Sequence, residues 1–372
     1  MLSKRRAMIY IVLANTVFIF FYLFGTTSLH LDSPLQSRSK KKYETTTALD
    51  RHATTTQSIP DNVDDKVKGN PATIQKPSSR EALSWRKKIH WESKIDQHDY
   101  RILINPRNIC KQSENITLLI LVKTRVSSIE ERNIIRETYG HGIVKYNVSA
   151  TILFLLGRES TYNSIAQVDL QKEADLHGDI LQEDFIDTYY NLTIKLIMGF
   201  KWASMSCSNT YFVMSTDDDC IVDIVNLAND LESNTSSTFL SNFALAERAI
   251  NWFPHRDPGD KWYTPRELYS ADRWLPFPRG YGYVVSREVA HLLYQASQKI
   301  APPAPWDDVY CGILLHSLGI EMQDIIVWFK TKRALAKLTA PLKVQDHYVI
   351  GGNGNTMNMM NTWTAVEKRY QT

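Results

Sequence analysis

Apolar and polar positions alternate in blocks from about Tyr100 onward, and these blocks predict a succession of strands and helices. Three runs rich in aliphatic and aromatic residues have the length and composition of buried strands: 116–122, 151–156 and 211–215. Two segments repeat apolar residues at helical spacing: 130–139 and 187–205. Alternation of strand and helix is typical of a mostly parallel central sheet flanked by helices. The pattern therefore predicts an α/β fold for this part of the chain.

A different pattern occupies the N-terminus, where an apolar run from Met8 to Phe24 follows the basic residues Lys4, Arg5 and Arg6. The run is at the short end of what spans a bilayer, and its basic flank favours a cytosolic N-terminus. A cleaved signal peptide is the alternative, but the run is longer than most signal-peptide cores and has no clear Ala-x-Ala cleavage site. We therefore expect a signal anchor and a single-span type II membrane protein with a luminal C-terminal part.

The segment after the apolar run is dominated by Ser, Thr, Lys, Asp and Pro and is poor in apolar periodicity. Such a composition buries too little apolar surface to offset the entropy of ordering the chain, so we expect a flexible, largely disordered stem. The predicted organisation is a cytosolic tail at 1–7, a transmembrane anchor at 8–25, the stem at 26–98 and a luminal domain at 99–372.

Charge and cysteine content narrow the function classes. The net charge of +3 is close to balanced, so no nucleic-acid partner is predicted. In an oxidising lumen up to two disulfides can form among four cysteines, with free buried thiols as the alternative: Cys110, Cys207, Cys220 and Cys311. None of them forms the CxxC pair of a zinc site.

Four Asn-x-Ser/Thr sequons make the protein a candidate glycoprotein: Asn115, Asn147, Asn191 and Asn234.

The most informative motif is the acidic triplet Asp217-Asp218-Asp219, which directly follows an apolar strand-like run. Adjacent anions repel one another, so a compensating cation is expected. Mg²⁺ and Mn²⁺ prefer oxygen ligands and are often held by carboxylates together with substrate phosphates. The carboxyl ends of strands are also where open α/β sheets bind ligands. The triplet predicts a metal-bridged diphosphate site, and a solvated acidic turn is the alternative.

A second acidic pair, Asp307-Asp308, precedes an apolar run that we expect to be a helix. Acidic residues at a helix N-terminus are stabilised by about 0.3–1 kcal/mol, so helix capping is one interpretation. The other is a general base that deprotonates a hydroxyl nucleophile. Four aromatic residues either stack on sugar rings or belong to the core: Trp274, Tyr281, Tyr283 and Trp306.

Six motifs, taken in order, resemble those of glycosyltransferase family 31, the group of β1,3-galactosyltransferases and β1,3-N-acetylglucosaminyltransferases. They are Glu131–Gly140, Phe154–Gly157, Asp179–Lys195, the triplet at 217–219, Gly280–Ser286 and Asp307–Gly312. The similarity extends from about Tyr100 to near His347. A single motif of this kind is weak, whereas six in the family order are highly specific.

The resemblance implies a GT-A fold and an inverting, metal-dependent transfer of a hexose from a UDP-sugar to the 3-hydroxyl of an acceptor glycan, forming a β1,3 linkage. UDP-galactose is the expected donor, and Mn²⁺ or Mg²⁺ is the expected cofactor. The acceptor is expected on a glycolipid or glycoprotein. Together with the signal anchor, the resemblance implies a type II protein of the Golgi membrane, and a homodimer stays open.

The resemblance also assigns roles to residues. The catalytic base is expected at Asp308, and the metal ligands at Asp219, Asp217 and His347. Donor binding is expected for Asp217, Asp218, Arg132 and Arg136, with a solvent-facing ion-pair role as the alternative for the two arginines. Acceptor binding is expected for Trp274, Tyr281, Gly282, Trp306 and Asp307.

The chain departs from the family pattern at Ser215-Thr216 in place of Lys-Thr, at Tyr139 in place of Trp and at Asp307 in place of Glu. None of these changes removes an expected carboxylate. Transfer of N-acetylglucosamine or N-acetylgalactosamine stays open, as does a non-catalytic glycan-binding relative or a scaffold for other transferases. Outside the family, Asp217-x-Asp219 loosely resembles a phosphatase nucleophile motif, but no second box of that class is evident.

Overall fold

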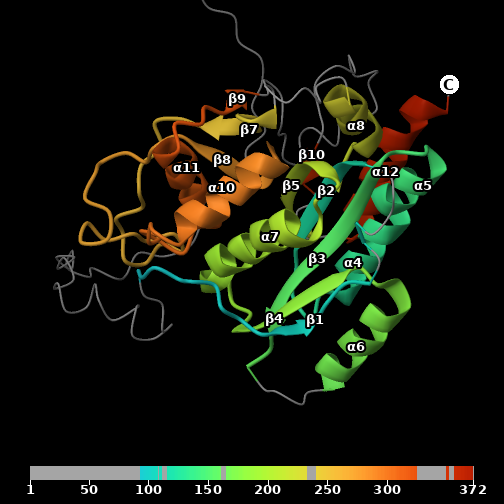
Figure 1. The fold of residues 1–372 in the computed structure, drawn as a ribbon, viewed down its shortest axis with the longest axis horizontal. Helices are drawn as coiled ribbons and strands as arrows, with labels where there is room; N and C mark the ends of the chain where they lie inside the picture. The colour runs from blue at the N-terminus through green and yellow to red at the C-terminus, as the bar shows by residue number, and fades with distance from the viewer. Residues whose placement is uncertain are drawn as a thin grey trace, which may run out of the picture. The chain divides into compact units, whose positions relative to one another are not determined.

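The computed structural model describes residues 93–107, 109–110, 115–160, 165–232, 240–324, 349–351 and 356–371 (Figure 1). All of them belong to one compact unit, Thr73–Thr372. The tail, the anchor and most of the stem predicted from the sequence lie outside the described residues, as do Asn234 and His347. Within the described ranges no helix combines the length and apolar character needed to cross a membrane.

A mixed eight-stranded sheet organises the described part of the chain. Its strands, in spatial order, are β1 (Ile102–Ile104), β4 (Ile180–Ile186), β3 (Ala150–Arg158), β2 (Ile116–Lys123), β5 (Thr210–Asp217), β8 (Phe277–Ser286), β7 (Ala244–Ala249) and β9 (Gln323–Asp324). The four strands β4, β3, β2 and β5 are parallel to one another, whereas β8 runs antiparallel to both β5 and β7. The expectation of a mostly parallel sheet is thus correct, and the antiparallel strands β8 and β1 make the sheet mixed.

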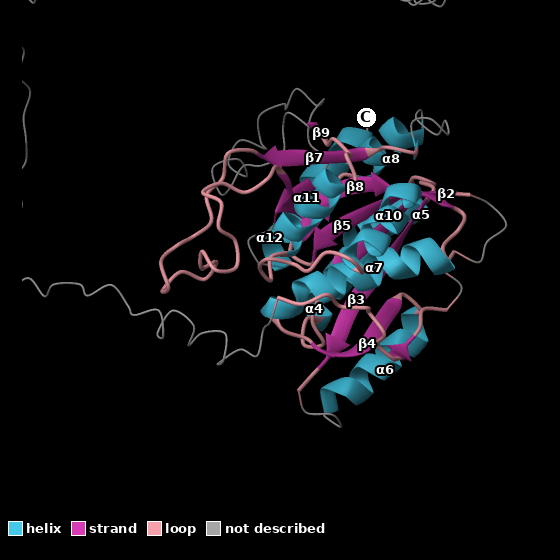
Figure 2. Ribbon diagram, turned by 60° about the vertical axis from the view of Figure 1, so that its left-hand side comes forward, coloured by secondary structure: helices cyan, strands magenta, loops and turns pink. Residues whose placement is uncertain are grey.

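Helices cover both faces of this sheet, as Figures 1 and 2 show. One face carries α7 (Leu192–Ser206), α10 (Arg287–Ser297) and α11 (Asp307–Ser317). The other carries α4 (Ile129–Ile135), α6 (Ile165–His177), α8 (Ile224–Glu232) and α12 (Thr356–Glu367). Short elements complete the order: η1 (Arg136–Gly140), α5 (His141–Lys145), η2 (Tyr189–Asn191), β6 (Cys220–Val222), β10 (Val349–Gly351) and η4 (Lys368–Tyr370).

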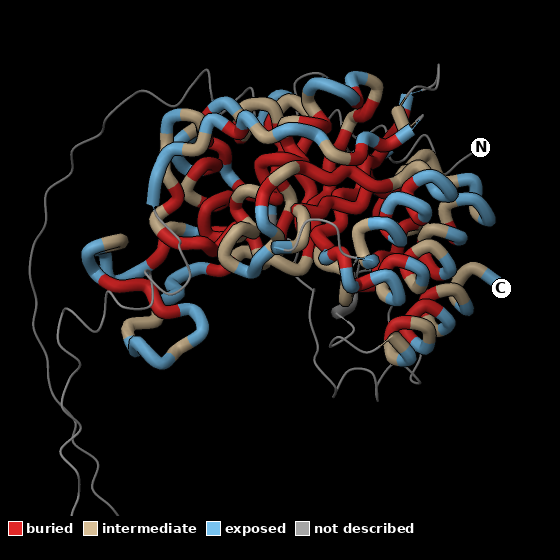
Figure 3. Tube along the Cα trace, turned by 90° about the horizontal axis from the view of Figure 1, so that it is seen from below, coloured by how far each residue is buried: buried red, intermediate tan, exposed pale blue. Residues whose placement is uncertain are grey.

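Side-chain alternation along β2 explains why the core has two halves. Leu118 and Ile120 pack with one set of helices, whereas Leu119 and Leu121 pack with the other. Successive side chains of a strand point to opposite faces, so a strand covered on both sides must be apolar throughout. All eight residues of β2 are buried, and the tube in Figure 3 is correspondingly buried through the middle of the domain.

The helix expected at 187–205 begins later, at Leu192. Thr188 is extended, and the short η2 turn precedes the helix. The helix expected at 130–139 ends its regular part at Ile135 and continues as the π-helical turn η1. In η1 the backbone of Thr138 leaves helical geometry, with φ −99° and ψ −107°. Both segments exist where apolar spacing predicts them, but their ends are set by the neighbouring turns.

Packing against the domain begins before Asp99, the residue at which the sequence places the domain boundary. Ser93 donates a hydrogen bond from Oγ to the carbonyl of Pro302 at 2.8 Å. His98 is buried and its Nε2 lies 2.7 Å from Oε2 of Glu183 on β4. The last residues assigned to the stem are therefore part of the packed structure.

A disulfide and a buried cluster of hydrogen bonds each join parts of the chain that are far apart in sequence. Cys110 and Cys207 form a disulfide across 97 residues of sequence, so one of the two disulfides that the sequence allows is present; Cys220 and Cys311 are buried free thiols. At the C-terminus, the fully buried Asp223 accepts hydrogen bonds from Tyr370 Oη at 2.5 Å and from Arg369 at 2.9 Å. The C-terminal turn is thereby attached directly behind β6.

Candidate active site

The acidic triplet lies at the carboxyl end of β5, in the interior of the sheet between β2 and β8. Asp217 is the last residue of the strand, and Asp218 and Asp219 form the turn into β6. The preceding residues of β5, Phe212, Val213 and Met214, are fully buried between the helices that cover the two faces of the sheet. The carboxylates therefore emerge where the apolar strand leaves the core, at the edge where α/β sheets bind ligands.

Lys123 supplies the cation of this site. It ends β2 and stands in register with Asp217 on β5. Its Nζ lies 3.1 Å from Asp217 Oδ1 and 2.5 Å from Asp307 Oδ2, and it donates to the Gly280 carbonyl at 3.3 Å. Burial alone would lower the pKa of Lys123, but the charges of Asp217 and Asp307 outweigh it and raise this pKa. The sequence analysis did not identify this lysine, although it ends the strand parallel to the one that carries the triplet.

The second acidic pair forms the first turn of α11, as the apolar run after it predicted. Asp308 accepts a hydrogen bond at Oδ1 from the Val309 backbone at 2.7 Å. Its carboxylate packs on Gly280 of β8, where a Cβ would stand 3.3 Å from Oδ2. Burial, and then the neighbouring charge of Asp307, raise the pKa of Asp308 to about 7. A carboxylate with a pKa near neutrality is suited to accept a proton.

Asp217 and Asp308 line one cavity of about 410 Å³. Asp307 lines it as well, so three carboxylates face this cavity, and Gly280 lies among them. The negative charge of Asp217 adds to the raised pKa of Asp308, after burial and the charge of Asp307. The end of β5 and the N-terminus of α11, which are far apart in sequence, thus contribute to a single site.

The carboxylates of the triplet are crowded. Burial raises the pKa of Asp217 to about 6; Lys123 opposes this shift, and the charges of Asp307 and Asp219 add to it. Asp218 accepts a hydrogen bond from Thr124 Oγ1 at 2.8 Å, and burial raises its pKa as well. Asp219 accepts from the Cys220 thiol at 3.5 Å.

This crowding fits a hard divalent cation. In the part of the chain that the structure describes, no three His, Cys, Asp or Glu side chains make up a metal site by themselves. The predicted ligands Asp219 and Asp217 are described, whereas His347 is not. Mg²⁺ and Mn²⁺ are commonly held by one or two carboxylates, with substrate phosphates and water completing the coordination. The donor set therefore suits a cation that arrives with a diphosphate.

Three of the predicted acceptor-binding residues line the cavity with their aromatic rings. Trp306 donates from Nε1 to Thr264 Oγ1 at 3.0 Å, and Trp274 stacks on Tyr269 with ring centroids 4.1 Å apart. Tyr281 donates from its hydroxyl to Glu247. Asp307 also lines the cavity, but its Oδ2 is already bound by Lys123.

Gly282 differs from the other predicted acceptor residues. It lies on β8 opposite Thr216 of β5 and is not among the residues that line the cavity. Tyr283, the fourth aromatic candidate, is buried among the α7, α10 and α11 side chains. For these two positions the structure supports a role in sheet packing.

Arg132 and Arg136, predicted to reach the donor, are placed elsewhere. Arg132 is fully buried and makes two hydrogen bonds to Glu173 of α6, at 2.8 and 2.6 Å, and one to the Arg125 carbonyl at 2.5 Å. Arg136 pairs with Glu173 and with both oxygens of Asp179. Most of the five N–H donors of each guanidinium are engaged by these protein partners, so both arginines connect α4 and η1 to the α6–β4 region. The alternative of a solvent-facing pair is also wrong.

Two sequons occupy the opposite end of the sheet from the acidic cavity. Asn115 and Asn147 are exposed and line a separate hollow of about 420 Å³. Asn191 is half-buried in η2, next to the cavity-lining Leu192, and its amide donates to the Ile186 carbonyl at 2.8 Å.

The mouth of the cavity is formed by residues that the sequence analysis did not select. They come from η2, from the long connection between β7 and β8, and from β8 itself, where Arg279 lies: Tyr189, Trp252, Phe253, His255, Trp262 and Arg279. Their signal in the sequence is weak, because aromatic residues spread over a connection look the same whether they line a site or pack a core.

Comparison with known proteins identifies the class. The galactosyltransferase family profile matches residues 130–325. Human β-1,3-galactosyltransferase 1 is 36% identical over 226 residues, covering 61% of this chain and 68% of that protein. Human β-1,3-galactosyltransferase 5 is 34% identical over 235 residues, covering 63% and 73%. A solved structure of the bifunctional glycosyltransferase WbbM has 11% identity and a TM-score of 0.39, covering 72% of this chain and 53% of that one.

The chain is thus a glycosyltransferase. It belongs to the galactosyltransferase family, glycosyltransferase family 31, as its six motifs indicated, and is a galactosyltransferase-like enzyme that uses a sugar donor and a glycan acceptor.

Proposed function

We propose that this enzyme transfers galactose from UDP-galactose to the 3-hydroxyl of an acceptor glycan, with inversion, to form a β1,3 linkage. The observation that carries the proposal is the single cavity lined by both Asp217 and Asp308. The names of the relatives, both β-1,3-galactosyltransferases, support galactose and the β1,3 linkage. The central parallel strands with carboxylates at their carboxyl ends support a GT-A-type fold.

Asp308 is the proposed base. It takes the proton from the acceptor 3-hydroxyl as that oxygen attacks the anomeric carbon, and its pKa of about 7 lets it bind a proton without holding it permanently. Attack from the face opposite the diphosphate turns an α-linked donor into a β-linked product. One carboxylate suffices for the proton transfer, in contrast to glycoside hydrolases, which use two.

The triplet holds the leaving group in this proposal. Asp219 and Asp217 would bind Mn²⁺ or Mg²⁺, which when bound neutralises charge on the departing diphosphate. Asp218, fixed by Thr124, keeps the turn in place beneath the donor. Lys123 holds Asp217 and Asp307 at the distance at which both face the cavity.

The acceptor ring is proposed to lie against the aromatic wall. Trp306 and Trp274 present flat apolar surfaces on the cavity side, as sugar-binding sites commonly do. Tyr281 and Glu247 form a hydrogen-bonded pair at the same wall, where a polar group can fix the orientation of an acceptor hydroxyl. The signal anchor predicted from the sequence, together with the family to which the chain belongs, supports a Golgi membrane location with a luminal catalytic domain.

A panel experiment tests the proposal. The full chain, purified from eukaryotic cells, is given UDP-galactose, UDP-N-acetylglucosamine or UDP-N-acetylgalactosamine with Mn²⁺ and a neutral acceptor sugar. We expect galactose transfer to dominate, the product linkage to be β1,3 by NMR, and chelation of the metal to stop it. The variant Asp219→Ala should lose metal-dependent UDP binding in calorimetry. Preferred transfer of an N-acetylhexosamine would replace the donor assignment, and the absence of both transfer and UDP-sugar hydrolysis would favour the glycan-binding alternative.

A further inference from the structure

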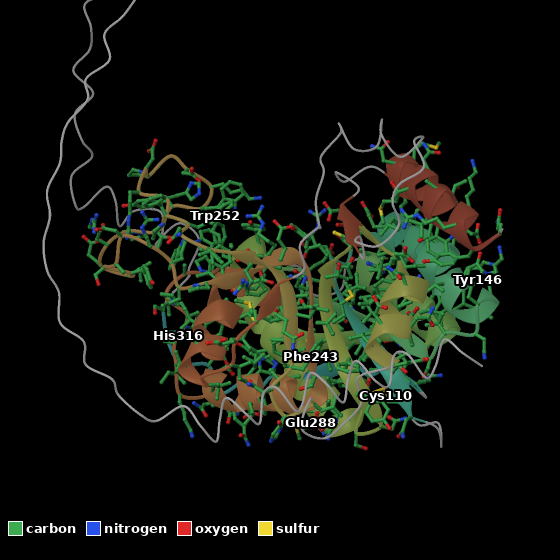
Figure 4. All side chains as sticks on the ribbon, turned by 90° about the horizontal axis from the view of Figure 1, so that it is seen from above. Cys110, Tyr146, Phe243, Trp252, Glu288 and His316 are labelled. Atoms are coloured by element: carbon green, nitrogen blue, oxygen red, sulfur yellow. A yellow bond between two sulfur atoms is a disulfide. The ribbon has the colours of Figure 1, made fainter. Side chains whose placement is uncertain are left out.

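A second hollow adjoins the catalytic cavity. It measures about 480 Å³ and is lined by the consecutive residues 250–255. Trp252, Phe253 and His255 line both this hollow and the catalytic cavity, so the two share a wall. Figure 4 shows Trp252 within the connection between β7 and β8, away from the sheet. An acceptor longer than one sugar can therefore continue from the catalytic cavity into this hollow.

The shared wall exposes large aromatic rings. Trp252 is 44% exposed, Phe253 59% and, near them at the mouth, Trp262 45%. Single exposed apolar residues are ordinary, but a group of them beside a catalytic cavity indicates a binding surface. Trp262 is held in place by a hydrogen bond from its Nε1 to Tyr189 Oη at 2.9 Å, so this ring is positioned before any ligand arrives.

Cations lie over these rings. The Arg279 guanidinium is 4.4 Å from the Trp252 ring centroid, and that of Arg273 is 4.5 Å from the Phe253 centroid. Lys261 Nζ is 4.0 Å from the Tyr189 centroid. Such contacts hold a cation over a ring, but they do not neutralise its charge.

These three cations also have no carboxylate within ion-pair distance in the described part of the chain. Arg266, in the same connection, is different, because it pairs with Asp272 at 2.6 Å. Asp217, Asp307 and Asp308 line the cavity together with Arg279, whereas Arg273 and Lys261 lie over the rings of Phe253 and Tyr189, which line it as well. An acceptor that is neutral at one end and anionic at the other complements this distribution of charge.

We propose that the rim formed by Arg273, Arg279 and Lys261 binds an acidic group, a carboxylate, sulfate or phosphate, on the sugar unit next to the one that receives the hexose. The inference rests on the proposed transferase function and specifies its acceptor class. The neutral acceptor sugar lies against Trp306 over Asp308, and the acidic unit lies between the cations with its ring on Trp252. The exposed rings alone would also suit a lipid, but the cations over them favour an anionic polar ligand.

Matched acceptors test the inference. The full chain is assayed with UDP-galactose and a neutral disaccharide, and with the same disaccharide carrying a uronate carboxylate, a sulfate or a phosphate on its second unit. We expect the preferred acidic acceptor to have a KM about tenfold lower than the neutral one, and this preference to weaken as salt is raised. The three arms distinguish which anion is recognised.

Charge variants identify the residues. Arg273→Gln and Arg279→Gln should each reduce the ratio of kcat/KM for acidic over neutral acceptors about threefold to fivefold. Arg279→Lys, which retains the charge, should retain most of the ratio. Arg266→Gln is the matched control, because its charge is already paired with Asp272, and it should leave the ratio unchanged. Circular dichroism of each variant verifies that it is folded.

Direct binding separates this inference from the proposed function. Calorimetry of the Asp308→Asn protein with the acidic and neutral disaccharides reports rim binding even if no acceptor is turned over. Equal affinity for both, or a preference that survives in the Arg273→Gln/Arg279→Gln double variant, overturns the inference. So does binding to vesicles of anionic lipid that depends on these arginines without any acidic-glycan preference, since the rim is then a membrane contact.

Discussion

Lys123 Nζ lies 2.5 Å from Asp307 Oδ2, and this contact joins the end of β2 to the first turn of α11. The same ammonium lies 3.1 Å from Asp217 Oδ1 on β5. One lysine, 4% exposed, thus holds together the strand that carries the acidic triplet and the helix that carries the proposed base. The residues directly before the triplet are Ser215-Thr216, so the positive charge beside Asp217 comes from the adjacent strand β2.

Lys123→Met should destabilise the protein and impair transfer. Removing one member of a buried ion pair costs about 3–5 kcal/mol, and we expect about 3 kcal/mol in the free energy of unfolding, because the Asp217 carboxylate is accessible from the cavity. The accompanying loss in kcat/KM should be at least about tenfold. Denaturant titration and steady-state kinetics measure the two effects. Lys172→Met, which removes an exposed partner of Asp169, is the control and should change stability by less than about 0.5 kcal/mol.

The double variant Lys123→Met/Asp307→Asn sharpens this test. It removes the cation together with one of the two carboxylates that the cation compensates, so part of the lost stability should return. If Lys123→Met alone is as stable as the wild type, the ion pairs contribute nothing and the proposed clamp is wrong.

Asp308→Asn should lower kcat by about a hundredfold or more while UDP binds with unchanged affinity. The amide cannot take the acceptor proton, and a positioned general base contributes about 10²–10⁴-fold. Transfer assays and calorimetry with UDP and Mn²⁺ measure the two quantities. Asp169→Asn, on the exposed face of α6, serves as a control for loss of a carboxylate remote from the cavity. Near-normal turnover by the Asp308→Asn enzyme would assign the base elsewhere.

The rate should depend on pH through Asp308. Its pKa is raised to about 7, and only the deprotonated form can act as a base. We therefore expect log kcat/KM, which reports the pKa values of the free enzyme, to rise with pH with a slope near one below pH 7 and to level off above it. The falling limb at low pH should vanish from the residual activity of Asp308→Asn. A profile that is flat between pH 5.5 and pH 8 would contradict both the raised pKa and the proposed role.

Arg132→Met should lower stability and leave donor binding intact. Glu173 would lose its closest partner while remaining buried, a change that costs about 3–5 kcal/mol. Thermal unfolding measures the stability, and the KM for UDP-sugar, determined well below the melting temperature, should stay within about twofold of the wild type. Arg107→Met, which removes an exposed partner of Asp175, is the matched control. A selective rise in the donor KM with unchanged stability would restore the donor-binding role.

Sequence periodicity predicted the buried parallel strands well, because a strand covered on both faces is apolar throughout. The runs at 116–122, 151–156 and 211–215 correspond to β2, β3 and β5. It did not predict β4, whose segment 180–186 mixes Gln182, Glu183 and Asp184 with apolar residues. Those polar side chains are satisfied by partners from other elements, and such pairing is not visible in one-dimensional periodicity.

Site residues could be predicted where neighbouring residues in the sequence form the motif. They could not be predicted where the role of a residue depends on a contact with a distant part of the chain. Consecutive carboxylates mark Asp217–Asp219 and Asp307–Asp308 in the sequence itself. Arginine spacing on a helix, by contrast, does not tell whether the guanidinium faces a ligand or a buried Glu173. Lys123 becomes informative only once the register of β2 against β5 is known.

The attachment of Tyr370 and Arg369 to Asp223 makes the turn η4 a structural support for the segment that follows the acidic triplet. Three residues separate that aspartate from the acidic triplet's last member, so removing the turn that holds Tyr370 and Arg369 would strip a buried anion of its partners close to the triplet. A fusion or tag attached after Tyr370 would therefore lie close to the contacts of Asp223, a residue that follows the acidic triplet closely in sequence.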